Sequence, residues 1–281
     1  MAGVPGLLVV NPRSGDTDRS VEELRRAAEE RGVTVHVLGP DENAGEVARL
    51  APEGPIGMAG GDGSLGAVAA VALERGVPFV CVPYGTRNHF ARDIGLNRDD
   101  PLAGLASFDG RERQVDVGRA GERLFLNNVS LGVYAHLVHR RTRARRRREL
   151  LAVARALAIA LRAEPLRATL DSRPLPARIV LVANNHYRLD LFSLGERERL
   201  DEGLLHLYAA ESVLPETWHE QTEVRFTLDV GAHRVHAAVD GEPTTLETPI
   251  EFRIEPRALR VLVPPAPQDG DGRPASAHRR Q

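Results

Sequence analysis

The stretch MAGGDGSLGAVAAVALERG, Met58 to Gly76, decides the fold. It joins an apolar, strand-like segment to a helix-spaced segment that is expected to begin near Ser64 and end at Gly76. The glycines between them permit positive φ and close backbone approach, and the helix N-terminus offers free amides to an anion. Read alone, this corner allows three interpretations: a phosphate site built from amides, a position for Asp62 in the chemistry, or a tight turn.

The residues around this corner alternate between strand and helix patterns. Strands are expected at residues 6–12, 33–39, 56–60 and 77–85, and helices at residues 20–32, 44–51 and 64–76. Unbroken apolar strands between helices are typical of a parallel sheet covered on both faces, with ligands beyond the carboxyl ends of the strands. The strand-end loops NPRSG (Asn11 to Gly15), GGDGS (Gly60 to Ser64) and PYGTRN (Pro83 to Asn88) are therefore expected to meet at one edge.

The pattern changes after about Asp116. Residues 111–133 predict a hairpin with a glycine turn, residues 134–164 predict two helices, and short alternating runs with Gly and Pro punctuation follow. We predict an α/β plus all-β protein. An N-terminal parallel-sheet α/β domain spans residues 1–118, an antiparallel β-sandwich domain with two helices spans residues 119–264, and a disordered tail spans residues 265–281.

The composition excludes several kinds of chemistry. The 281 residues include no lysine, which rules out a phosphate-loop lysine, a protein-kinase strand lysine and a Schiff-base lysine. Cys81 is the only cysteine, so neither a disulfide framework nor a thiolate metal site is expected, as suits a reducing cytoplasm. The HEQTE segment at His219 lacks the second histidine of a zinc helix. Any phosphate would therefore be bound by amides, arginine and a metal ion.

No segment has the pattern of a signal peptide or of a membrane-spanning helix. The start MAGVPGLLVVNPRSG has no basic region before its apolar run, and the most apolar segment, Leu150 to Leu161, is interrupted by Arg155. Seven arginines lie between Arg140 and Arg148. Two interpretations stay open for this basic stretch: contact with an anionic lipid surface, or a solvated helix end.

The polar residues of the loops suggest specific roles. Ser64 could cap the following helix and still offer its hydroxyl to phosphate, and Asn88 could cap the next helix. Asp62 would repel a phosphate, so it makes sense either as a Mg²⁺ ligand or as a proton acceptor. The distant VDGEP segment, Val239 to Pro243, read alone is a hairpin turn, because Asp-Gly between strands is a strong turn signal.

The ordered set NPRSG, GGDGS and PYGTRNHFARDIGL resembles the nucleotide-binding signatures of the diacylglycerol kinase catalytic domain family, which includes bacterial lipid kinases and sphingosine kinases. The later segments LFLNNVSLGV, RIVLVANNHY, GERERLDEGLLHLY and VDGEP resemble the β domain of that family, so the resemblance covers roughly Leu7 to Pro264. It implies a lipid kinase that uses ATP and Mg²⁺, binds the nucleotide between its two domains, and transfers the γ-phosphoryl group to a diacylglycerol-like or sphingoid-like hydroxyl.

The resemblance also implies roles for individual residues. Asp62 would be the central acid and bind the catalytic Mg²⁺, Asp240 and Glu242 would face the same cleft, and one of these two would accept the proton of the lipid hydroxyl. Asp201 and Glu202 match a segment that binds a structural Mg²⁺. The residues that would contact the nucleotide or its metal are Asn11, Pro12, Ser14, Gly15, Gly60, Gly61, Asp62, Gly63, Ser64, Gly85, Thr86 and Asn88.

Two residues depart from the family pattern. Ser64 replaces the usual threonine and keeps its hydroxyl, whereas His89 stands where the family often has an acid. An NAD kinase is an alternative, but that family usually carries an Asn-Glu pair where this chain has Asn127 and Asn128. A catalytically silent nucleotide- or lipid-binding module is the other alternative. The expected partners are a lipid substrate, an anionic membrane surface and a second copy of the chain, with no nucleic acid, in a cytoplasmic location peripheral to the membrane.

Overall fold

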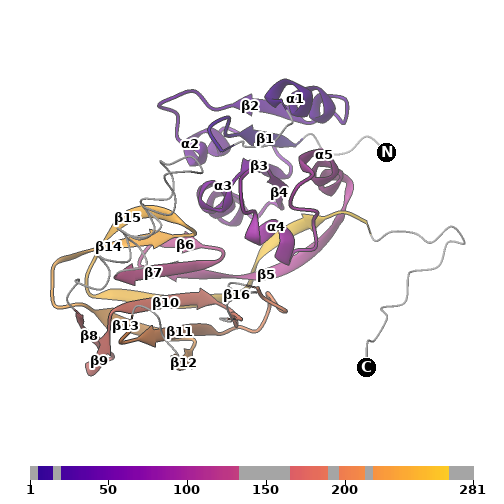
Figure 1. Cartoon of the computed structure of the whole chain (residues 1–281). Helices are drawn as coiled ribbons and strands as arrows, with labels where there is room; N and C mark the ends of the chain where they lie inside the picture. Colours follow the sequence, from indigo (N-terminus) through magenta and orange to yellow (C-terminus); the bar gives the residue numbers. More distant parts are fainter. Residues whose placement is uncertain (1–5, 15–19, 133–164, 189–195, 213–217, 266–281) are drawn as a thin grey trace, which may run out of the picture.

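The N-terminal part of the protein alternates strands and helices, as the sequence predicts. The computed structural model describes residues 6–14, 20–132, 165–188, 196–212 and 218–265 (Figure 1). Its first elements are β1 (Leu7–Val10), α1 (Val21–Glu29), β2 (Thr34–Val37), α2 (Ala44–Arg49), β3 (Ile56–Gly60), α3 (Asp62–Arg75) and β4 (Phe79–Pro83). β1 pairs in parallel with β2 and β3, and β3 pairs in parallel with β4. The predicted α/β architecture is confirmed.

Local residue choices explain where these helices begin and end. Ser20 and Asn43 have extended backbones, and their side chains accept N–H groups from the first turns of α1 and α2. Gly76 ends α3 in the left-handed conformation, with φ of 62°. These caps satisfy amides and carbonyls that a helix end would otherwise leave without partners.

The rest of the described chain is mainly antiparallel. It contains α4 (His89–Asp93), α5 (Pro101–Gly104), a 3₁₀ helix (Leu105–Asp109), β5 (Arg111–Ala120), β6 (Arg123–Phe125), β7 (Asn128–Gly132), β8 (Leu166–Leu170), β9 (Arg173–Ala177), β10 (Ile179–Asn184), β11 (Leu205–Ala210), β12 (His219–Glu223), β13 (Arg225–Asp229), β14 (Arg234–Val239), β15 (Glu242–Glu247) and β16 (Ile250–Val263). A second sheet has the strand order β12-β11-β10-β7-β14-β15. It packs as one layer of a sandwich, and this confirms the predicted all-β part.

The long strand β16 joins the two parts of the molecule. Its first residues pair with β13, whereas Val261 and Leu262 pair in parallel with β4. The register along β5 shifts between Glu255 and Leu259, where the buried Asp116 accepts the N–H of Arg257 at 2.7 Å. The first sheet therefore runs from the α/β part into the sandwich, and the segment 119–264 supplies a strand to the N-terminal sheet.

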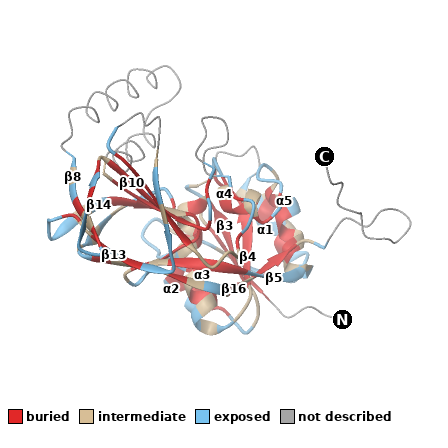
Figure 2. Ribbon diagram, turned by 90° about the horizontal axis from the view of Figure 1, so that it is seen from below, coloured by how far each residue is buried: buried red, intermediate tan, exposed pale blue. Residues whose placement is uncertain are grey.

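Buried apolar residues gather on both faces of the first sheet and between the two sheets. β3, β4 and β10 are buried along their whole length (Figure 2). Such unbroken burial is expected of strands covered on both faces. The polar residues at the ends of these strands are therefore held on a rigid base.

Some predictions lie outside the described residues. These are the two helices at 134–164, the basic stretch Arg140–Arg148, Gly15 and all but the first residue of the tail at 265–281. Within the part of the chain that is described, no helix combines the length and the apolar character that crossing a bilayer requires.

Candidate functional site

The GGDGS corner lies between β3 and α3. Helix α3 begins at Asp62, earlier than expected, and its N-cap is Gly61. The prediction that Ser64 caps this helix is wrong, because the cap position carries no side-chain hydrogen bond and Ser64 lies inside the first turn. The Ser64 hydroxyl instead accepts a hydrogen bond from Asn11 Nδ2 at 3.1 Å and lies 3.3 Å from Ser14 Oγ. The first and second strand-end loops are thus joined at the N-terminus of α3.

The third loop is in backbone contact with the second. A Cβ atom at Gly85 would overlap with the Cα atom of Gly61, so only glycine allows this approach. The N–H of Tyr84 also donates to the carbonyl of Gly60 at 3.3 Å. Pro12 and Thr86 are exposed on the same loops. Every described residue of the predicted nucleotide site therefore belongs to one of the three segments NPRSG, GGDGS and PYGTRN, which meet at one edge of the sheet.

Asn88 shapes the third loop but does not cap α4. It occupies the N-cap position with φ of 49°, and its side chain makes no cap hydrogen bond. Its amide group instead donates to the carbonyls of Gly85 and Arg98 at 2.8 and 2.7 Å, and its Oδ1 accepts the N–H of Gly85 at 2.9 Å. The predicted cap is wrong because the side chain of Asn88 is used to close the loop.

Asp62 takes over the capping of α4. Its carboxylate accepts the N–H groups of His89 at 3.0 Å and Phe90 at 2.9 Å, and Asn127 Nδ2 donates to it at 3.2 Å. His89 Nδ1 lies 3.4 Å from the same carboxylate. Burial by itself raises the pKa of Asp62, but His89 and the two amides outweigh burial and lower it below its usual value. A buried, ionised carboxylate therefore stands at the centre of the site.

The VDGEP segment is a hairpin turn, and it also reaches the site. Asp240 and Gly241 connect β14 to β15 with φ of 49° and 84°, as a two-residue hairpin turn of the primed type requires. The buried Asp240 carboxylate accepts N–H groups from Leu126 at 2.8 Å, Asn127 at 2.7 Å and Asn128 at 3.0 Å. Burial raises the pKa of Asp240 to about 7, in spite of these three amides.

Glu242, the second acid of this hairpin, lies directly against the GGDGS corner. A Cβ atom at Gly63 would overlap with Cγ of Glu242, so the side chain crosses the first turn of α3 at the one position where no side chain intervenes. Glu242 is exposed, whereas Asp240 is buried. The structure thus brings both predicted acids of the hairpin to the corner that carries Asp62.

Asp201 and Glu202 have other neighbours. Asp201 lies 3.2 Å from Arg199 and 3.6 Å from Arg257, and Glu202 accepts the N–H of His186 at 2.8 Å. Among the described residues, no group of three or more His, Cys, Asp or Glu side chains is arranged to hold a metal ion. The predicted structural Mg²⁺ site therefore remains a prediction.

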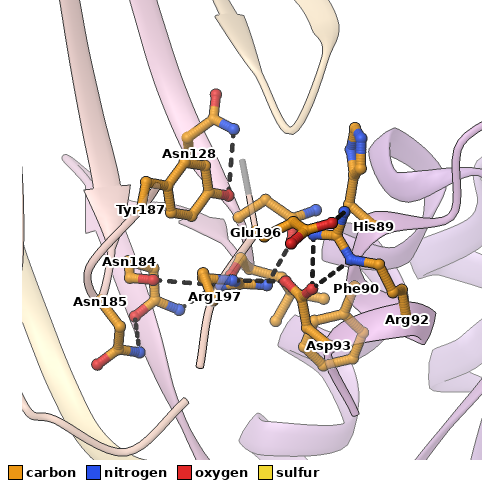
Figure 3. Close-up of polar contacts among 12 residues, drawn as sticks. His89, Phe90, Arg92, Asp93, Asn128, Asn184, Asn185, Tyr187, Glu196 and Arg197 are labelled. Atoms are coloured by element: carbon orange, nitrogen blue, oxygen red, sulfur yellow. Dashed lines mark hydrogen bonds and ion pairs between the residues drawn. The ribbon is translucent and has the colours of Figure 1, made fainter. Parts of the chain in front are cut away.

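A buried polar network next to Asp62 was not predicted (Figure 3). Arg197, with a fully buried side chain, donates to Asp93 Oδ2 at 2.7 Å and to Asn127 Oδ1 at 2.7 Å. Its guanidinium also lies over the ring of Tyr187, 5.5 Å from the centroid. The consecutive pairs Asn127-Asn128 and Asn184-Asn185 were a usable signal, since asparagines that directly follow apolar residues need hydrogen-bond partners where they are buried. The Glu-Arg-Glu-Arg run around Arg197 gave no such signal.

The chain is similar to several known proteins. Residues 5–120 match the family model of the diacylglycerol kinase catalytic domain. The chain is 23% identical over 303 residues to a probable lipid kinase YegS-like protein of Klebsiella pneumoniae, covering 94% of this chain and 98% of that protein. It is 28% identical over 142 residues to a diacylglycerol kinase of Bacillus subtilis, covering 47% of each chain. A putative diacylglycerol kinase from Bacillus anthracis shares the fold, with a TM-score of 0.65, 20% identity, and coverage of 92% of this chain and 96% of that one.

Proposed function

We propose that the chain is a member of the diacylglycerol kinase catalytic domain family and a lipid kinase that transfers the γ-phosphoryl group of ATP to a lipid hydroxyl group, because residues 5–120 match that family model and 94% of the chain is similar to a probable lipid kinase. One observation carries this proposal. Three strand-end loops meet at the N-terminus of α3, and the carboxylate of Glu242 from the second sheet lies over Gly63 at the same point. Phosphoryl transfer needs positioned charges more than covalent chemistry, and this arrangement supplies both anion-binding amides and acids.

The three strand-end loops are suited to bind the phosphate chain of a nucleotide. The backbone of Gly61 lies directly against that of Gly85, and Asn11, Ser14 and Ser64 add polar side chains beside the first turn of α3. We propose that these loops bind ATP, and that residues 1–118 form the nucleotide side and residues 119–264 the lipid side.

The acids fit Mg²⁺ held together with substrate phosphates. Mg²⁺ is usually bound through one or two carboxylates plus phosphates, and a closed protein cage is not needed. We propose that the Asp62 carboxylate binds the Mg²⁺ ion in place of His89 Nδ1. At 3.4 Å, His89 Nδ1 is the most distant of its polar neighbours. The ion would neutralise the charge on the transferred phosphoryl group.

We propose Glu242 as the acceptor of the lipid hydroxyl proton. Its carboxylate is exposed beside Gly63, whereas both oxygens of Asp240 already accept backbone N–H groups. A general base must come within hydrogen-bond reach of its substrate, and only the exposed acid can do so without rearrangement. Asp240 then holds the start of β7 in place.

The test uses purified protein, labelled ATP, Mg²⁺ and a panel of diacylglycerol, monoacylglycerol, ceramide, sphingosine, polyprenol and NAD. Label in a lipid is expected, and Glu242→Gln should remove it while leaving ATP binding intact. Label only in NAD would replace the proposal with an NAD kinase, and label in no acceptor would favour a catalytically silent module.

Because the proposed substrate is a lipid, we further propose that the protein is cytoplasmic and binds transiently to the membrane surface. Cosedimentation with anionic vesicles measures that contact.

A further inference from the structure

We propose that Arg197 is a positioning residue of the phosphoryl-transfer site, which it serves by orienting Asn127 against Asp62 and by holding the end of helix α4. The proposal rests on the proposed function for its kinetic consequence only. Arg197 makes no contact with Asp62 itself, so its action passes through other residues.

The guanidinium group of Arg197 is almost completely satisfied by hydrogen bonds. Nε donates to Asp93 Oδ2 at 2.7 Å, Nη1 donates to the carbonyls of Leu126 at 2.7 Å and Asn184 at 3.2 Å, and Nη2 donates to Asn127 Oδ1 at 2.7 Å. Burying a charge is costly unless such partners replace water. The planar fork of an arginine reaches all four acceptors at once, which the point charge of a lysine could not.

Asn127 can take only one orientation between its two neighbours. An arginine donates hydrogen bonds and accepts none, and an ionised carboxylate accepts hydrogen bonds and donates none. Asn127 must therefore turn its Oδ1 to Arg197 and its Nδ2 to Asp62, as the distances of 2.7 and 3.2 Å show. Without Arg197, Asn127 Oδ1 would lose this donor, and the longer hydrogen bond to Asp62 would be left to orient the amide group.

The same contacts hold α4 at both ends. Asp62 accepts the first two amides of the helix, from His89 and Phe90, and Arg197 holds Asp93 at its last residue. Asp62, Asn127, Arg197, Asp93 and α4 thus form a closed ring of contacts, and Figure 3 shows Arg197 between α4 and the ends of the sandwich strands. The ring ties the GGDGS corner to the second sheet.

The chain offers a matched control two residues away. Arg199 has the same chemistry in the same segment, but its side chain is 59% exposed and pairs with Asp201 on the surface. Replacement of Arg199 by Met should therefore leave the ring intact.

The direct test measures hydrogen exchange of the peptide that contains the His89 and Phe90 amides. Arg197→Lys keeps a charge for Asp93 but loses the fork to Asn127, so these amides should lose protection relative to the wild type and to Arg199→Met. Unchanged protection in Arg197→Lys would overturn the proposal. This measurement needs no substrate, so its result is independent of whether the protein proves to be a lipid kinase.

The kinetic test separates positioning from stability. In Arg197→Lys we expect kcat to fall about 100-fold with little change in the KM for ATP, because small misplacements of catalytic groups cost rates of that order. The double variant Asp93→Leu/Arg197→Met replaces both buried side chains with apolar groups. It should be more stable in urea unfolding than Arg197→Met, which leaves the Asp93 carboxylate buried with Arg92 as its remaining cationic partner. Its kcat should stay low, because Asn127 still lacks its donor. Recovery of kcat together with stability would show that Arg197 is only structural.

Discussion

Gly63 shows how much of the site depends on a missing side chain. The backbone at this position does not have positive φ, and alanine in a helix is favoured over glycine by about 1 kcal/mol. Alanine would nevertheless overlap with Glu242, which crosses the helix at this point. We therefore predict that Gly63→Ala keeps or raises stability but lowers lipid-kinase kcat by tenfold or more, on the order expected for a displaced catalytic group. Thermal unfolding and initial rates measure the two effects separately.

Two controls belong to the Gly63→Ala prediction. In Gly66→Ala, on the same helix, the new Cβ atom lies 3.4 Å from the carbonyl of Leu124, an ordinary contact, so activity should persist. In a Glu242→Ala background, where transfer is already lost, Gly63→Ala should leave the affinity for an ATP analogue unchanged. A loss of that affinity would mean that alanine acts on the phosphate loop and not on Glu242.

Asp240 makes stability depend on pH. Burial raises its pKa to about 7, above the usual value of 3.8, so between these values the folded protein keeps a proton that the unfolded chain releases. Its contribution to the free energy of unfolding is therefore complete below the unfolded pKa and is lost as the pH rises through about 7. The wild-type advantage over Asp240→Asn should shrink from about pH 5 to about pH 8 in urea titrations. An advantage that grows over this range would contradict the raised pKa.

At the scale of elements, the contact between two loops sets the shape of the nucleotide site. Gly85 and Gly61 approach so closely that a Cβ atom at Gly85 would overlap with the partner backbone. We predict that Gly85→Ala separates the GGDGS and PYGTRN loops and weakens binding of an ATP analogue by tenfold or more, because each lost backbone contact to an anion costs more than 1 kcal/mol. Isothermal titration calorimetry gives the dissociation constant.

The control for Gly85→Ala is Thr86→Ala. Thr86 is exposed on the same loop, and its truncation leaves the backbone contact unchanged. A nucleotide affinity that is unaltered in Gly85→Ala would mean that the loops bind nothing at their point of closest approach. An equal loss in both variants would point to the side chain of Thr86.

The sequence predicted the positions of helices and strands better than the hydrogen-bond partners of individual side chains. Strand and helix patterns located β1 to β4 and α1 to α3, since each follows from its own residues. Local rules failed where a distant side chain competes for the same hydrogen bond. The N-terminal amides of α4 are capped by Asp62, which is distant in the chain, and not by the neighbouring Asn88. Arg197 and Arg199 look alike in the sequence, and only the tertiary fold decides that the first is buried.

At the scale of the whole molecule, the first sheet connects two apolar cores that the sequence assigned to separate domains. β5 and β16 run through both parts, and Arg197 connects Asp93 of helix α4 to Asn184 at the end of β10 in the second sheet. Unfolding of one part alone would break the shared sheet and the buried ion pair, so a state with only one part folded is unfavourable. The same continuity holds Glu242 against Gly63, so the relative placement of the two parts belongs to the site itself.

We therefore predict that the protein unfolds in a single cooperative transition. The chain carries one reporter for each part: Cys81, the only cysteine, is buried in the first sheet, and Trp218, the only tryptophan, packs near Tyr208 on the second. Thiol labelling of Cys81 and fluorescence of Trp218 should give the same urea midpoint, as two-state unfolding requires. In Arg197→Met the midpoints should fall together. Two separate midpoints in the wild type would show that β5 and β16 do not couple the cores.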